Sequence, residues 1–206
     1  MGTELFFKLQ ENLLPVLRAG DLAQCEQTVA KALSALPKSP FHCILDLSIT
    51  NRVEEVAEYF DRFFREEAPP NRVGAVYTEM NGFDINPDRW YFEALAYAEH
   101  GGHDDYDWLA DCQWEACGDQ NITGLEALQD AYASDAFGQE DYGDASQVAG
   151  LLVVIKFQDL IRRTAPHIRE LRVPLLATAH GYDFIYEARP EVIADGGAPD
   201  DDGHRT

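Results

Sequence analysis

The stretch Val73–Ala98, "VGAVYTEMNGFDINPDRWYFEALAYA", carries the clearest strand signals in the chain. Residues 73–79 and 90–98 are rich in the β-branched and aromatic side chains that favour strands. Between them lies "NGFDINPD" (81–88), whose Asn-Gly and Asn-Pro pairs are typical of turns. We therefore predict two antiparallel strands, joined as a hairpin by a long loop.

Upstream of this hairpin, residues 4–36 have the pattern of two paired helices. In the second one, apolar residues recur every three or four positions, which predicts one buried stripe made of Leu22, Cys25, Val29, Leu33 and Leu36. Gly20 followed by Asp21 fits the end of one helix and the N-cap of the next. Pro15 interrupts the first helix, which we expect to be either kinked or split.

Two more elements are expected before the hairpin. Apolar and polar side chains alternate from Phe41 to Ile49, which predicts a strand with Cys43 on its apolar face, as a small core residue. Asn51 and Glu54 then have capping-box spacing, which predicts the start of a helix. Pro69-Pro70 ends that helix.

The chain after the hairpin contains both helices and strands. We predict a helix over Thr123–Ala133, capped by Thr123 and Glu126, and a more apolar, central helix over Ser146–Thr164 that packs across the sheet. Residues 173–179 and 183–188 fit two short strands, or one strand with a bulge at Gly181. The pattern of residues 108–116 fits a strand and a short helix equally.

This order of elements predicts an α+β fold, with helices packed on an antiparallel sheet of about four to six strands. We expect a single domain over residues 1–189, beginning with the helical hairpin at 4–36. Residues 190–206 have little to bury and are expected to form a disordered acidic tail. The chain has none of the common glycine-rich phosphate-binding motifs.

Charge limits the function classes. The 206 residues include 37 acidic and 16 basic ones, giving a formal net charge of −21. So negative a chain repels nucleic acid and anionic membranes, but attracts basic proteins. The alternative is an acidity that serves general solubility or reflects an acidic source organism. Without a signal-peptide pattern or a long apolar run, we expect a cytoplasmic location and reduced cysteines.

The acidic residues are concentrated in one part of the chain. Residues 90–155 contain fourteen acidic residues and no lysine or arginine, together with all three tryptophans. Carboxylates can steer and pair with basic side chains, while tryptophan and tyrosine supply buried anchors. We therefore predict a binding site for a basic protein within residues 99–144, centred on Asp104, Asp105, Asp107, Trp108, Asp111, Trp114 and Glu115.

The same region offers candidates for other chemistry. His100 and His103 form an H-x-x-H pair with Cys112 and Cys117 nearby, which makes these four residues candidate metal ligands. However, two glycines separate the histidines, and Cys112 and Cys117 lack a second cysteine pair. We therefore expect no metal and no cofactor. His180 with Asp183 could act as an acid and a base, but a histidine bonded at a bend explains the pattern as well.

The strings "YDWLADCQWE", "ITGLEALQDAYAS" and "ATAHGYDFIYEAR" resemble segments of acidic bacterial proteins. The general character of residues 73–188 is similar to that of the immunity proteins that neutralise secreted bacterial toxins. This resemblance implies a non-catalytic protein that binds and blocks a toxin domain, often a basic nuclease. Two alternatives remain open. One is a metal-dependent hydrolase that uses His100, His103 and neighbouring aspartates. The other is a non-catalytic structural or regulatory subunit.

Overall fold

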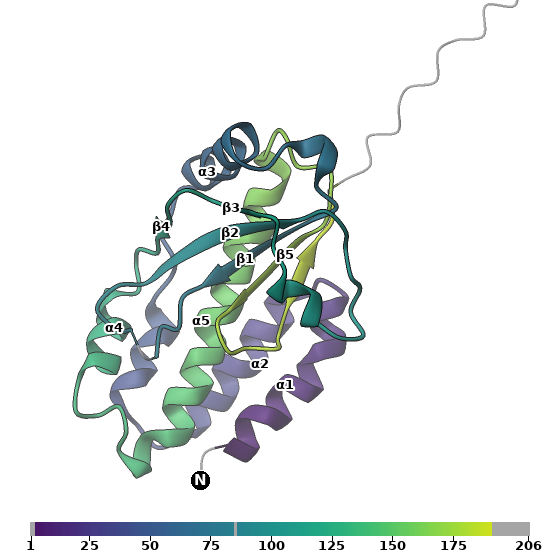
Figure 1. Cartoon of the computed structure of the whole chain (residues 1–206). Coiled ribbons are helices and arrows are strands. Elements are labelled where there is room, and N and C mark those ends of the chain that lie inside the picture. The colour runs from purple at the N-terminus through teal and green to yellow at the C-terminus, as the bar shows by residue number, and fades with distance from the viewer. Residues whose placement is uncertain (1–2, 85, 191–206) are drawn as a thin grey trace, which may run out of the picture.

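A mixed six-stranded sheet lies between a layer of helices and a long loop in the computed structural model, which describes residues 3–84 and 86–190 (Figure 1). The strands follow the order β3-β2-β1-β5-β6, with β4 also paired to β2. Their bounds are β1 Ala75–Met80, β2 Tyr91–Tyr97, β3 Trp114–Glu115, β4 Gln120–Asn121, β5 Leu175–Ala179 and β6 Tyr186–Ala188.

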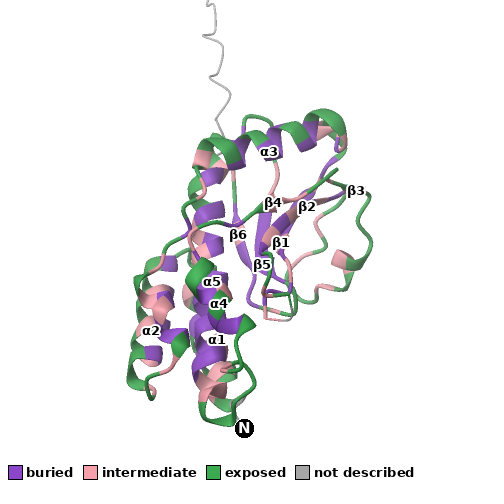
Figure 2. Cartoon of the chain, turned by 90° about the vertical axis from the view of Figure 1, so that its left-hand side faces the viewer, coloured by how far each residue is buried: buried purple, intermediate pink, exposed green. Residues whose placement is uncertain are grey.

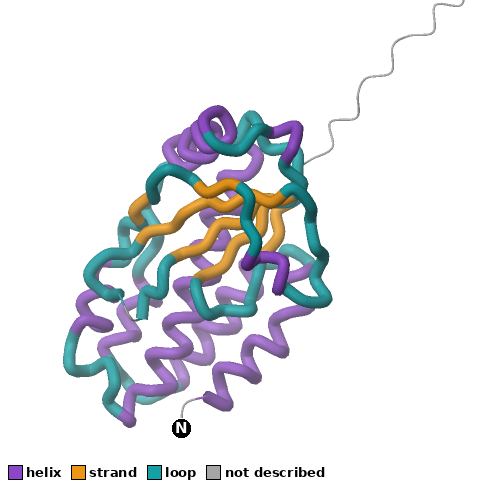
Figure 3. Tube along the Cα trace, viewed as in Figure 1, coloured by secondary structure: helices purple, strands orange, loops and turns teal. Residues whose placement is uncertain are grey.

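The helices gather mainly on one face of this sheet (Figure 3). The α-helices are α1 Thr3–Arg18, α2 Leu22–Ala35, α3 Val53–Glu66, α4 Glu126–Ala133 and α5 Gly143–Thr164. Short 3-10 helices are η1 Pro40–Asp46, η2 Pro70–Arg72, η3 Asp107–Ala110, η4 Glu140–Tyr142 and η5 Ala165–His167. Among the described residues, no helix combines the length and apolar character needed to cross a membrane.

The predicted hairpin is confirmed as β1 and β2, which pair antiparallel from Ala75 opposite Tyr97 to Met80 opposite Phe92. The α+β class is confirmed as well. The sheet differs from a purely antiparallel one in a single pair, because β5 runs parallel to β1. Parallel neighbours need a long crossover connection. Here α5 lies between the hairpin and β5 in the chain and packs against the sheet.

The central helix predicted from the apolar run near residue 150 is confirmed as α5. Its residues Val148 to Ile155 are all buried, so no side of this segment faces solvent. At its second half, the buried Gln158 side chain donates to the backbone oxygens of Ala177 (3.1 Å) and Phe184 (2.6 Å). These bonds connect α5 to β5 and to the segment before β6.

The predicted strand at 41–49 is wrong, since residues 40–46 form η1 instead. The reason is local. Ser39 N donates to His42 Nδ1 (3.2 Å), and His42 Nε2 bonds to Leu33 O (2.9 Å), which fixes a tight turn against α2. Phe41 and Ile44 are both fully buried, and three-residue spacing places them on one side of a 3-10 helix. Cys43 is half-buried and packs at the edge of the core.

The paired helices at residues 4–36 are confirmed as α1 and α2. Gly20 takes a positive φ of 81°, and Asp21 caps α2 by accepting from Gln24 N (2.9 Å). Pro15 lies inside α1, which is a single helix and is not split.

The helices predicted after Asn51 and Thr123 are confirmed, but neither capping box forms. The N-caps are Arg52 and Leu125. Asn51 Oδ1 instead accepts from Thr123 N (3.0 Å), which joins the starts of the two segments.

Two open assignments are also resolved. Residues 108–116 contain both alternatives, because η3 is followed by β3. Residues 173–188 form two strands, β5 and β6, with Gly181 at the turn between them. The predicted disordered tail lies, apart from Pro190, outside the described residues.

Candidate functional site

The two faces of the sheet are covered differently. α5 and its neighbours pack on one face, here called the inner face, while residues 98–113 run across the other, outer face (Figures 1 and 2). We call residues 98–113 the strap. Beneath it lies a small second core, formed by Ala75, Tyr77, Tyr97, Leu176 and Ile185 and packed by Leu95, Tyr106, Trp108 and Leu109.

Trp108, in η3, fixes the strap to the sheet. Its ring meets the Tyr97 ring edge to face, with centroids 4.9 Å apart, and its Nε1 donates to Gly102 O (3.2 Å). Gly101 passes so close that a Cβ there would lie 2.3 Å from the indole. The Tyr97 hydroxyl also donates to Leu109 O (2.8 Å). The strap is therefore held by aromatic packing and by hydrogen bonds.

A pocket of about 300 Å³ opens where the strap leaves the sheet. Tyr97, Glu99, Trp108 and Asp111 are among the residues that line it; Tyr97 is almost fully buried, Trp108 is half-buried, and Glu99 and Asp111 are exposed. Ala98, Gly101 and Gln113 complete the lining, and Gln113 Oε1 accepts from Ala98 N (2.7 Å). A half-buried tryptophan beside two exposed carboxylates is suited to a lysine or arginine side chain, through cation–π attraction and charge-assisted hydrogen bonds.

Beyond the strap, the outer face carries carboxylates on adjacent strands. Glu79 of β1 lies directly opposite Glu93 of β2, and like charges in such positions repel. Burial raises the pKa of Glu93 above its ordinary value, and so do the charges of Glu115, Glu79 and Asp119. Glu79, Glu93 and Glu115 therefore make this area negative, while the Asp119 carboxylate is paired with the guanidinium of Arg89.

The predicted partner-binding residues separate into two groups. Asp104, Asp105, Asp107, Asp111 and Glu115 are exposed, and among the described residues none of them forms an ion pair with a basic side chain. The two tryptophans are half-buried. Trp108 packs under the strap, while Trp114 packs against the main core on the inner face, with the Arg72 guanidinium 5.4 Å from its ring.

The segment without basic residues does not form one continuous surface. The strap and Glu115 belong to the outer face, whereas α4 packs against η1 beside the helical layer. Residues 120–144 therefore contribute their acidic side chains elsewhere on the molecule. The candidate surface is consequently narrower than the predicted range 99–144.

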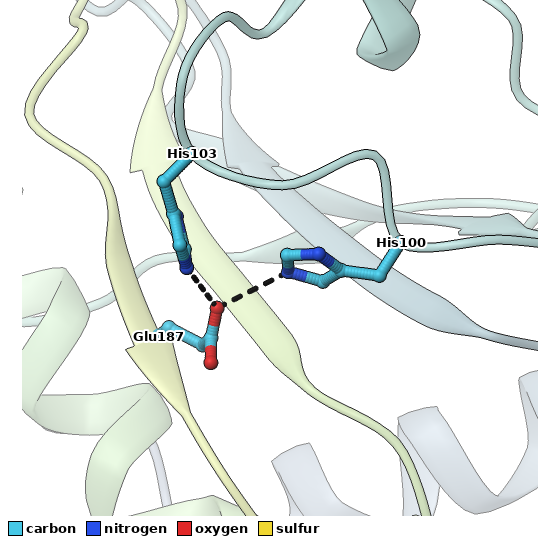
Figure 4. A group of neighbouring side chains, drawn as sticks. All are labelled: His100, His103 and Glu187. Carbon is cyan, nitrogen blue, oxygen red and sulfur yellow. Dashed lines mark hydrogen bonds and ion pairs between the residues drawn. The ribbon is translucent and has the colours of Figure 1, made fainter.

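The two histidines of the strap meet a glutamate from the far end of the chain (Figure 4). Glu187 Oε2 lies 3.2 Å from His100 Nε2 and 2.8 Å from His103 Nε2. Burial alone would raise the pKa of Glu187, but its hydrogen bond to Arg189, the positive charge of Arg189 and the two histidines together hold it below the ordinary value. Glu187 is therefore an ionised carboxylate that ties the strap to β6.

The other candidate ligands do not join this group. Cys112 and Cys117 are exposed free cysteines and are not part of the cluster. Glu187 was missed by sequence reasoning, because it follows His103 by 84 positions and no motif links them.

His180 pairs with a residue that the sequence pattern did not indicate. Its Nδ1 lies 2.6 Å from Glu79 Oε1, and the hydroxyl of Tyr77 donates to Glu79 Oε2 (2.6 Å). The predicted partner, Asp183, forms no ion pair with it in the described part of the chain. The Glu79 carboxylate thus orients an exposed imidazole at the ends of the parallel strands β1 and β5.

No protein-family model, curated protein or solved structure matches this chain.

Proposed function

We propose that this chain is a binding module for a basic protein, of the inhibitor or immunity type, acting in the cytoplasm. The observation that carries the proposal is the pocket lined by Tyr97, Glu99, Trp108 and Asp111. It lies within a sequence segment that has no basic residue of its own. A lysine or arginine of the partner would enter this pocket.

The exposed carboxylates around the pocket support the same function. Asp104, Asp107 and Asp111 project from the strap without a basic partner among the described residues, and Glu93 and Glu115 lie on the adjoining sheet. The electrostatic field of these carboxylates speeds the association with a basic surface, and it weakens as salt is added. A basic partner would also relieve the repulsion between Glu79 and Glu93.

Charge reversal on the strap tests the proposal. We choose Asp104→Lys, Asp107→Lys and Asp111→Lys, and leave Asp105 in place because its Oδ1 accepts from Asp107 N (3.0 Å) and shapes the strap. Immobilised protein is exposed to an extract of its native cells, and captured proteins are identified by mass spectrometry. We expect a basic protein that the original chain retains at low salt and that the variant loses.

The matched control introduces the same change in net charge at a different place on the surface. Asp130→Lys, Asp135→Lys and Glu140→Lys alter exposed residues of the same acidic segment, but near α4 and η4. This variant should retain the partner. Equal capture by both variants, or a captured partner that is not basic, would contradict the proposed surface.

The two other functions expected from the sequence stay as predictions. A metal-dependent hydrolase would have Glu187, and not a neighbouring aspartate, beside His100 and His103. Assays of ester, phosphodiester and peptide hydrolysis with added zinc or manganese test that function. A structural or regulatory subunit would instead copurify with its assembly at any salt concentration.

A further inference from the structure

We infer that His100, His103 and Glu187 form a binding site for a divalent transition-metal ion, which joins the strap to β6. This inference does not depend on the proposed function, because it concerns the chain alone and needs no partner. It gives the H-x-x-H pair a third ligand that lies far away in the sequence.

The positions of the donor atoms carry the inference. One nitrogen from each imidazole and one oxygen of Glu187 all lie within 4.8 Å of one another, and Figure 4 shows both rings directed at the same carboxylate. Ligands about 2.0–2.1 Å from a tetrahedral zinc ion lie roughly 3.3 Å from each other. The Glu187 oxygen lies 3.2 Å and 2.8 Å from the two nitrogens, which is close to that ligand spacing.

The surroundings also fit a site with three protein ligands. The Glu187 side chain is 10% exposed, and Arg189 Nε occupies its other oxygen at 2.5 Å, which leaves Oε2 as a single-atom ligand. The His103 side chain is 39% exposed, so the ion can arrive from solvent and keep a water molecule. Two histidines and a carboxylate suit zinc and related ions, whereas magnesium and calcium prefer oxygen ligands alone.

The Nδ1 contacts of the two imidazole rings indicate which hydrogen bonds metal binding must change. A ligating imidazole carries its proton on the other nitrogen. His103 Nδ1 lies 3.3 Å from the Tyr106 hydroxyl, whose oxygen can accept a hydrogen bond from that N–H. His100 Nδ1 accepts from Gly102 N (3.0 Å), so coordination through Nε2 moves the proton to Nδ1 and breaks this bond. Gly102 has a positive φ of 93° and no Cβ, which lets the peptide turn away.

The experiment measures metal binding to the full chain by calorimetry, after chelator treatment and dialysis. The starting protein carries Cys112→Ser, Cys117→Ser and His204→Ala, because free thiols and a stray histidine also bind zinc. We expect one zinc ion per chain, no comparable binding of magnesium, and a change in the amide resonance of Gly102. Cobalt should give the visible absorption of a tetrahedral site.

Two substitutions test the ligands, and a third is the control. His103→Ala and Glu187→Gln should each weaken zinc binding by about tenfold or more. His180→Ala removes an exposed histidine outside the cluster and should leave the affinity unchanged.

The inference is overturned if the starting protein binds no zinc, or if zinc affinity is the same in all three variants. If a ligand variant does not fold, the Gly102 resonance and the cobalt spectrum of the starting protein decide the question. Failure here would leave the charge-reversal result of the proposed function intact, since that experiment alters none of the three ligands.

Discussion

Asp61 is a carboxylate almost completely withdrawn from solvent, on the inward side of α3. Its side chain is 3% exposed. Oδ1 accepts from the backbone nitrogens of Arg169 (2.8 Å) and Glu170 (3.2 Å), while Oδ2 accepts from Arg169 Nε (2.8 Å). A buried charge persists only where such bonds replace its hydration. Asp61 therefore fixes the segment between η5 and β5 against α3.

Replacing Asp61 by alanine should destabilise the fold by about 1–3 kcal/mol, because two backbone donors lose a charged acceptor that is almost completely buried. Urea unfolding followed by circular dichroism measures this loss. Arg169→Met is the matched change, since it removes the exposed guanidinium and keeps the backbone bonds. Arg169→Met should lower the free energy of unfolding clearly less than Asp61→Ala does. An equal loss in the two variants would show that the ion pair, and not the backbone bonds, accounts for the stability.

Glu93 predicts a dependence of stability on pH. Its pKa in the folded chain is raised above 4.5 by burial and by neighbouring carboxylates, so the folded state binds its proton more tightly than the unfolded state does. Keeping Glu93 ionised therefore lowers stability as the pH rises above 4.5. Glu93→Gln should be more stable than the original chain at pH 7, and the two should converge below about pH 4.5.

Thermal unfolding between pH 4 and pH 8 measures this difference. Glu99→Gln is the control, since that residue is exposed and outside the group of Glu79, Glu93, Glu115 and Asp119. A constant difference at every pH would contradict the electrostatic explanation.

At the scale of elements, the hairpin was predictable from its β-branched and aromatic residues on either side of a turn, and α5 from an apolar run that is buried on every side. The alternation at Phe41–Ile49 led to a wrong prediction of a strand. The same segment also places apolar side chains three positions apart, at Phe41 and Ile44, which suits the 3-10 helix η1. The hydrogen bond between His42 and Leu33 O favours the 3-10 conformation, and a pattern of apolar residues cannot predict such a contact. The candidate metal site was half predictable for the same reason. His100 and His103 are three positions apart in the sequence, whereas Glu187 reaches them only through the pairing of β6 with β5.

Gly150 of α5 lies against Tyr182 in the β5–β6 turn. A Cβ at this position would lie 2.5 Å from the Tyr182 hydroxyl oxygen and 3.4 Å from the Phe83 ring. Gly150→Ala should therefore lose stability, by about 1–3 kcal/mol from overpacking, reduced by the roughly 0.5–1 kcal/mol that alanine gains in a helix.

Removing the Tyr182 hydroxyl should recover the stability that Gly150→Ala loses. The double variant Gly150→Ala with Tyr182→Phe should unfold at a higher urea concentration than Gly150→Ala alone. If alanine stabilises the helix without that second change, the close contact does not constrain this position.

For the whole molecule, the net charge of −21 implies self-repulsion that salt should relieve. The screening length falls from about 30 Å at 0.01 M to about 3 Å at 1 M. We expect the melting temperature to rise as sodium chloride is added. The variant with lysines at positions 104, 107 and 111 raises the formal charge by six and should show a smaller rise. Equal salt dependence in both proteins would show that ion-specific effects dominate.

The parallel pairing of β1 with β5 also bears on how the chain is made. A ribosome releases β1 and β2 early, yet β5 begins only at Leu175, close to the end of the described chain. Until then the nascent hairpin has an open edge at β1, the kind of edge on which other chains can pair. The carboxylates of Glu79 and Glu93 lie side by side on the nascent hairpin, and they would repel the same hairpin of a second nascent chain. The same two charges that weaken the finished fold would then protect the unfinished one.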